Sequence, residues 1–85
     1  MAMRRKSREL LQNLGGRSLD RLLVDGKAKV MPEQACVVIK TPRMCVTITR
    51  DELDAVFFDY CEGYLQIGKL AAYRAMTYLK QLKRL

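Results

Sequence analysis

The stretch ACVVIKTPRMCVTITRDE, residues 35–52, decides the expected fold of this 85-residue chain. Residues 36–39 and 45–48 are rich in β-branched side chains, which favour strands. Pro42 lies between them, and its fixed φ suits the second position of a turn. We therefore predict a β-hairpin over about residues 35–49. Because an isolated two-stranded hairpin is marginal in water, the rest of the chain must cover its apolar side.

A helix start follows the hairpin directly, at residues 49–52, Thr-Arg-Asp-Glu. This is the spacing of a capping box, in which the threonine hydroxyl accepts from the glutamate N–H and the glutamate carboxylate accepts from the threonine N–H. Apolar residues then recur at helical spacing. Gly63 is expected to end this helix and Gly68 to interrupt the next stretch. Residues 50–85 therefore form either two helices or one long bent helix, since each glycine costs only about 1 kcal/mol in a helix.

The N-terminal part of the chain predicts two short helices. The first is ended by Gly15-Gly16, and the second runs from Ser18 as N-cap to Gly26. Residues 1–8, which are nearly all polar and basic, are expected to form a solvated arm. Residues 27–34 are expected to form a polar connection to the hairpin.

The expected fold class is α+β, with short N-terminal helices, a hairpin, and one or two C-terminal helices packed on it. Residues 1–85 form one small domain, with a basic helical segment at 1–29 and a core at 35–85. A chain of this size has a thin core, so a partner subunit is expected. Small and apolar side chains gather on one side of the last helix, at Gly68, Ala71, Ala72, Ala75, Leu79 and Leu82. Because small residues let another helix approach closely, we expect a homodimer through this face.

The net charge of +7 lies entirely in the first fifty residues. Residues 1–29 carry eight basic and three acidic side chains, residues 30–50 carry three and one, and residues 51–85 carry five of each. Basic side chains that neutralise phosphates bind nucleic acid without sequence-specific geometry. The candidate binding residues are Arg4, Arg5, Lys6, Arg8, Arg17, Arg21, Lys27, Lys29 and Arg43.

The residue types and their spacing argue against an enzyme, a cofactor and a metal site. The chain has no histidine to act as a general base or to complete a zinc site. Its three cysteines, expected to be small core residues, are Cys36, Cys45 and Cys61. The aspartates after the hairpin, Asp51, Asp54 and Asp59, are explained by their position on the acidic start and face of a helix.

We expect a cytoplasmic protein that does not enter a membrane. The basic start lacks the apolar region of a secretion signal. The longest apolar run, residues 35–39, is far shorter than the roughly 18 residues that span a bilayer.

Three classes of function fit these observations. The leading one is a small basic regulator that binds DNA or RNA through its N-terminal half, as a dimer. The second is a protein-binding inhibitor or adaptor, of the kind that phages and mobile elements encode, acting on a nucleoprotein or an acidic protein surface. The third is a structural assembly subunit. Base reading would need regularly spaced polar side chains on a rigid element, as at Arg43, Thr47 and Thr49.

Overall fold

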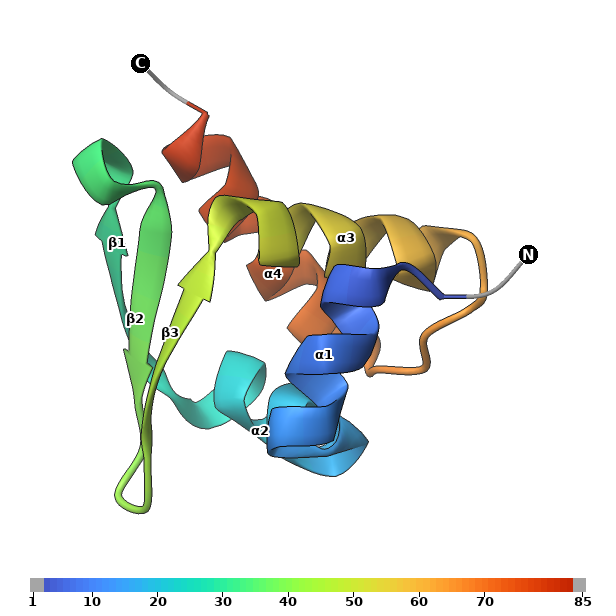
Figure 1. Ribbon diagram of the computed structural model, residues 1–85. Coiled ribbons are helices and arrows are strands. Elements are labelled where there is room, and N and C mark those ends of the chain that lie inside the picture. The colour runs from blue at the N-terminus through green and yellow to red at the C-terminus, as the bar shows by residue number, and fades with distance from the viewer. Residues whose placement is uncertain (1–2, 84–85) are drawn as a thin grey trace.

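The computed structural model describes residues 3–83, which form four α-helices and a three-stranded antiparallel sheet (Figure 1). The elements are α1 (Arg5–Leu14), α2 (Gly16–Asp25), β1 (Lys27–Met31), the short 3-10 helix η1 (Pro32–Gln34), β2 (Cys36–Lys40), β3 (Cys45–Thr49), α3 (Arg50–Cys61) and α4 (Lys69–Leu82). The expected α+β class is confirmed. Within this part of the chain, no helix is both long and apolar enough to cross a membrane.

Strands β2 and β3 form the predicted hairpin. Lys40 lies opposite Cys45, and the four residues between them make the turn. The N–H of Thr41 donates to the carbonyl of Met44 at 2.8 Å, which closes the turn. The Thr41 hydroxyl oxygen accepts from the N–H groups of Arg43 and Met44, at 3.3 and 3.1 Å.

A third strand, β1, lies where we expected a polar connection, and that expectation is wrong. Lys27–Met31 pairs antiparallel with β2, with Val30 opposite Val37. The link between the two strands is η1 followed by Ala35, which adopts a φ of +53°. Two lysines alternate with Ala28 and Val30, and this alternation is the period of a strand. The high polarity of the segment conceals that period.

The core lies between one face of the sheet and the helices, which Figure 1 shows gathered on the same side of the sheet. Val37, Ile39 and Ile48 point from the strands into this core and are fully buried. The helices and the loop before α4 contribute Leu10, Leu19, Leu22, Leu23, Leu53, Val56, Leu65, Tyr78, Leu79 and Leu82. The opposite face of the sheet is not covered by these helices.

The capping box at the start of α3 is confirmed. The N–H of Glu52 donates to the Thr49 hydroxyl oxygen at 3.2 Å, and the N–H of Thr49 donates to Glu52 Oε1 at 3.0 Å. The helix ends at Cys61, shortly before Gly63, whose φ is +83°. Since residues 62–68 are not helical, the C-terminal part forms two helices rather than one.

Helix α1 begins at Arg5, within the segment that we expected to be a solvated arm. The N–H of Arg4 donates to Asp59 Oδ2 of α3 at 2.9 Å. The guanidinium carbon of Arg4 lies 3.9 Å from the centre of the Phe58 ring. A carboxylate at the N-terminal end of a helix also stabilises the helix dipole. These contacts dock the segment on α3, so the arm prediction is wrong for its described part, which includes the fully buried Ser7.

The N-cap of α2 lies three residues before the expected one, at Gly15 instead of Ser18. Gly15, with a φ of +80°, ends α1 as predicted and is also the N-cap of α2. Ser18 therefore lies inside α2 and does not cap it. Gly26 ends α2 as predicted. Residues 1 and 2, at the start of the expected arm, lie outside the described residues.

The expected dimer face on α4 is not a surface of the molecule. Ala71 and Ala75 are 0% exposed, and the same side of α4 buries Ala72, Leu79 and Leu82. The small side chains bring α4 close to the core of its own chain, so they are unavailable to a second copy. Gly68 is exposed but lies at the N-cap of α4, where its N–H donates to Asp20 Oδ1 at 2.7 Å. The prediction that this face of α4 forms the dimer interface is therefore wrong.

Candidate nucleic-acid interface

The basic residues selected from the sequence lie in three separate groups, and all of them are exposed. The N-terminal group, around the start of α1, comprises Arg4, Arg5, Lys6 and Arg8. The α2–turn group comprises Arg17, Arg21 and Arg43. The sheet group comprises Lys27 and Lys29 of β1, to which the structure adds Lys40 of β2. The charge of the N-terminal half is thus divided, and each group has its own surroundings.

The N-terminal group has acidic neighbours. Arg5 Nε lies 3.0 Å from Glu9 Oε1, four residues further along α1. Residues 4–6 also line a hollow that they share with Asp51 and Asp54 of α3. Nearby carboxylates reduce the positive potential that attracts a phosphate. This group is therefore a weaker anion site than its four positive charges suggest.

The sheet group lies on the uncovered face of the sheet. Strand residues alternate between the two faces, so the inward-pointing Val37 and Ile39 place Lys40 on the outside. Lys27 is the register partner of Lys40, and Lys29 follows on the same face of β1. The outer face comprises Lys27, Lys29, Met31, Cys36, Val38, Lys40, Cys45, Thr47 and Thr49. It carries three lysines and no acidic residue.

Lys40 is a candidate that the sequence interpretation missed. Lys40 follows the first β-branched segment, residues 36–39, and so falls in the expected turn, but β2 includes it and the turn begins one residue later. The alternation of Lys27 and Lys29 with apolar residues was the available signal. Once β1 is recognised as a strand, its lysines and Lys40 fall on one face.

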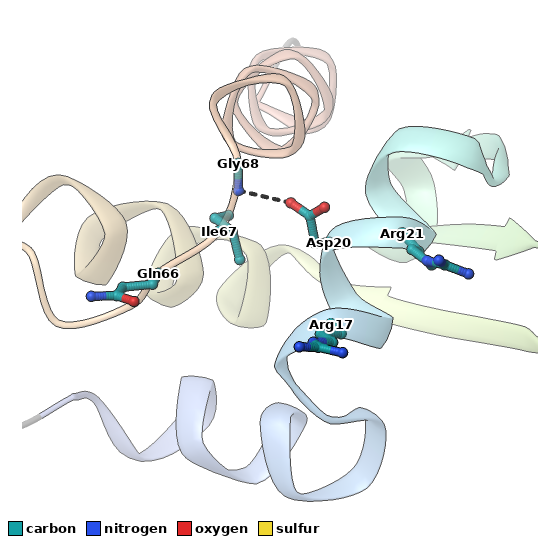
Figure 2. Close-up of a pocket in the computed structure, with 6 residues that line it drawn as sticks. All are labelled: Arg17, Asp20, Arg21, Gln66, Ile67 and Gly68. Atoms are coloured by element: carbon teal, nitrogen blue, oxygen red, sulfur yellow. Dashed lines mark hydrogen bonds between the residues drawn. The ribbon is translucent and has the colours of Figure 1, made fainter.

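Arg21 connects Arg17 to Arg43 along the surface. A shallow hollow between α2 and the segment that enters α4 is lined by Arg17, Asp20, Arg21, Gln66, Ile67 and Gly68 (Figure 2). A second hollow has Arg21 on one side and Arg43 of the hairpin turn on the other, with Asp25 also in its lining. The three arginines therefore follow one another from α2 to the turn.

Asp20 is occupied by a contact with the start of α4. Figure 2 shows its carboxylate pointing at Gly68, while Arg21 points away from Gly68. The ion pairs among residues 3–83 are Arg5–Glu9 and Lys83–Asp54. In that part of the chain neither Arg17 nor Arg21 has a carboxylate in an ion pair with it, so both guanidinium groups can bind an anion. Asp20 and Asp25 line the same hollows and reduce the positive potential there.

The sheet group and the α2–turn group meet at one end of the sheet. Lys27 and Lys40 form the row of the sheet next to the hairpin turn, and Arg43 lies within that turn. We call the joined set the basic surface, and it consists of Lys29, Lys27, Lys40, Arg43, Arg21 and Arg17. Lysine acts on a phosphate as a point charge, whereas arginine offers paired donors.

The neighbours of these lysines indicate which part of a nucleic acid would be contacted. None of the outer-face residues is aromatic, so this face offers no stacking platform for single-stranded bases. Thr47 is exposed there, but the Thr49 hydroxyl is occupied by the capping box. The face therefore suits contacts with the phosphate backbone more than the reading of bases.

The cysteines differ from expectation. Cys36 is buried, as predicted, although the strand alternation places it on the outer face of the sheet, whereas Cys45 and Cys61 are exposed. Cys45 projects from the outer face because β3 alternates, with Val46 and Ile48 turned toward the core. The prediction that all three are core residues is therefore wrong for two of them.

Comparison of the chain with protein-family models, with curated proteins and with solved structures gave no match. Its function is therefore inferred from the residues and geometry described above.

Proposed function

We propose that this chain is a small, non-enzymatic regulatory protein of the cytoplasm that binds the phosphate backbone of DNA or RNA, acting as a homodimer. The observation that supports this most is the outer face of the sheet, with three lysines and no carboxylate. Arg43 and Arg21 extend this face around the end of the sheet. Lysines and arginines that neutralise phosphates gain free energy from released counterions.

The basic surface, rather than the N-terminal group, is the main contact in this proposal. The N-terminal group is compensated by Glu9 and by the acids of α3. Its Arg4 is also held against Phe58. The sheet lysines have no such partners among residues 3–83.

The test is binding to random-sequence duplex DNA and RNA as a function of salt. Replacing Lys27, Lys29 and Lys40 together by glutamine should reduce the slope of log affinity against log salt by about 2.7 for each subunit that contacts duplex DNA, and so by about 5.4 for a dimer with both sheets engaged, because each lost phosphate contact contributes about 0.9. A matched control removes the same charge from the exposed side of α4, with glutamine at Lys69, Arg74 and Lys80. This control should keep nearly the wild-type slope.

Two results would contradict the proposal. One is the absence of binding to either nucleic acid at low salt. The other is an equal loss of slope in both triple variants, which would mean that only the net charge matters. Replacing all four residues of the N-terminal group by alanine measures the contribution of that group to the salt slope. This contribution should be smaller per charge than that of the sheet lysines.

The alternative, an inhibitor or adaptor that binds an acidic protein surface, would use the same lysines. It is favoured by the lack of aromatic residues on the outer face and by the single hydroxyl, that of Thr47, that remains free for base reading. Competition with poly-glutamate distinguishes the two. A polyanionic peptide that binds as tightly as nucleic acid, charge for charge, would support the alternative.

A further inference from the structure

The two edges of the sheet differ in how they are protected against pairing with another strand. The order β1-β2-β3 leaves one side of β1 and one side of β3 without a neighbouring strand. β1 carries Lys27 and Lys29 and is followed directly by Pro32, which are features that discourage edge pairing. β3, Cys45–Thr49, has no charge and no proline, and four of its five residues, all except Cys45, are β-branched and favour strands. The β3 edge is therefore the one suited to accept a partner.

The hydrogen-bonding phase of the hairpin shows which backbone groups of β3 are used by β2. The N–H of Thr41 donates to Met44, so these two residues form a hydrogen-bonded pair. Hydrogen-bonded and non-hydrogen-bonded pairs alternate along an antiparallel ladder. In the register of the hairpin, the N–H and C=O groups of Val46 and Ile48 therefore form the hydrogen bonds with β2, opposite Ile39 and Val37.

The groups that point away from β2 belong to Cys45, Thr47 and Thr49. The N–H of Thr49 is taken by Glu52 Oε1 at 3.0 Å, which agrees with this phase. Cys45 and Thr47 are exposed, and their N–H and C=O groups have no backbone partner on this side among the described residues. The free edge thus presents two donors and two acceptors, centred on Val46.

We propose that β3 pairs antiparallel with β3 of a second copy of this chain, about a two-fold axis at Val46. Cys45 then lies opposite Thr47 of the second copy, and Thr47 opposite its Cys45. Each of these pairs exchanges two N–H···O bonds, so all four free groups of each copy are satisfied. The half-buried Val46 faces its own counterpart. The edge is self-complementary, which a two-fold dimer requires.

A second copy fits this edge better than a charged partner does, because β3 itself is neutral. Pairing joins two sheets of three strands into one and sets the two outer faces side by side, which doubles the number of exposed lysines on a continuous sheet. Two chains of +7 repel each other, so added salt should strengthen the dimer. Nucleic-acid binding should respond to salt in the opposite direction. The inference deepens the homodimer of the proposed function, but it does not rest on nucleic-acid binding, since self-association is measured without ligand.

The first measurement is sedimentation equilibrium of the full chain, from micromolar to millimolar concentration, at low and high salt. A short edge contact of this kind is small, so a weak dimer whose population rises with concentration and with salt is expected. A monomer at every concentration and salt would overturn the proposal. A dimer that weakens as salt rises would also overturn it.

Proline at position 47 tests the edge directly. Thr47→Pro removes an N–H that β2 does not use, so the fold of the monomer should survive, as edge strands tolerate proline at such positions. The loss of one donor from each copy should raise the dimer dissociation constant by about tenfold or more. The matched control is Ala28→Pro, which removes an outward N–H from β1 by the same alternation and should leave the dimer unchanged. The proposal would be overturned if both variants had the circular dichroism spectrum of the wild type and raised the dimer dissociation constant equally.

A cross-link gives a result that does not depend on proline. In a background with Cys45→Ser and Cys61→Ser, Val46→Cys places one thiol at the two-fold axis, in a non-hydrogen-bonded pair close enough for a disulfide. Oxidised glutathione should convert this variant to a covalent dimer, with reduced glutathione as the product. The control has Ala28→Cys in the same background. Cross-linking of Val46→Cys no faster than that control would show that the subunits do not meet at β3.

Discussion

Replacing Ser7 by alanine is expected to stabilise the protein. Ser7 lies in α1 with 0% of its surface exposed, and its Oγ has no hydrogen-bond partner among the described residues. A buried hydroxyl without a partner costs about 1–3 kcal/mol. Alanine is also a better helix former than serine, by less than about 0.7 kcal/mol. We therefore expect the free energy of unfolding to rise by about 1–3 kcal/mol.

The assay is urea unfolding followed by far-UV circular dichroism, with the slope m fitted freely for each protein. Thermal unfolding gives a second readout, in which each 1 kcal/mol corresponds to roughly 4–8 °C for a domain of this size. The matched control is Asn13→Ala, at an exposed position of the same helix. It gains helix propensity without removing a buried polar group, so its effect should be a few tenths of a kcal/mol.

A loss of stability in Ser7→Ala, or a gain equal to that of the control, would refute the reasoning. Either result would mean that the hydroxyl is satisfied in the folded protein. Asp59 Oδ1 is the other buried side-chain atom without a partner in residues 3–83. A double variant with Asp59→Asn would then show, through non-additive free energies, whether the two groups share a hydrogen bond or a bridging water.

Two further predictions concern stability and use the same unfolding assay. Thr49→Ala should cost about 0.5–2 kcal/mol because the Glu52 N–H loses its acceptor, while Thr49→Ser should cost far less; equal losses would mean that residue 49 is not the N-cap. Gly26→Ala should cost about 1–3 kcal/mol, because its Cβ would collide with the Ile39 side chain and the carbonyl of Leu22, which cannot move freely. Gly68→Ala is the milder comparison, since its Cβ would meet only the Asp20 side chain at 3.0 Å; a Gly26→Ala variant as stable as this one would show that the α2–β1 junction adapts easily.

The parts of the fold that the sequence predicts are those specified by neighbouring residues. The hairpin follows from two β-branched segments around a proline turn, and the start of α3 follows from the Thr49–Glu52 spacing. β1 was not predicted because the polarity of its two lysines conceals the strand period of the segment, which the pairing with β2 makes plain. The docking of α1 on α3 was not predicted because the carboxylate that binds its start, that of Asp59, is far away in the sequence.

The candidate site was predictable in residue type but not in arrangement. The excess of positive charge selected Lys27 and Lys29, yet it could not separate them from Arg5, whose charge is compensated by Glu9. Such compensation depends on which helix faces are adjacent in space. The small residues of α4 show the same limit, since a face that permits close helix approach serves a core and an interface equally well. The structure assigns Ala71 and Ala75 to the core.

The contact between Arg4 and Asp59, 55 positions apart, has a consequence for the order in which the chain folds. Ribosomal synthesis proceeds from the N-terminus, so α1 leaves the ribosome well before the carboxylate that caps it exists. A ten-residue helix is marginal in water on its own. The sheet, built from strands joined by short turns, needs only local contacts and can form early. The first helix to be synthesised is therefore among the last to dock, and its leucines stay accessible to chaperones until α3 has been completed.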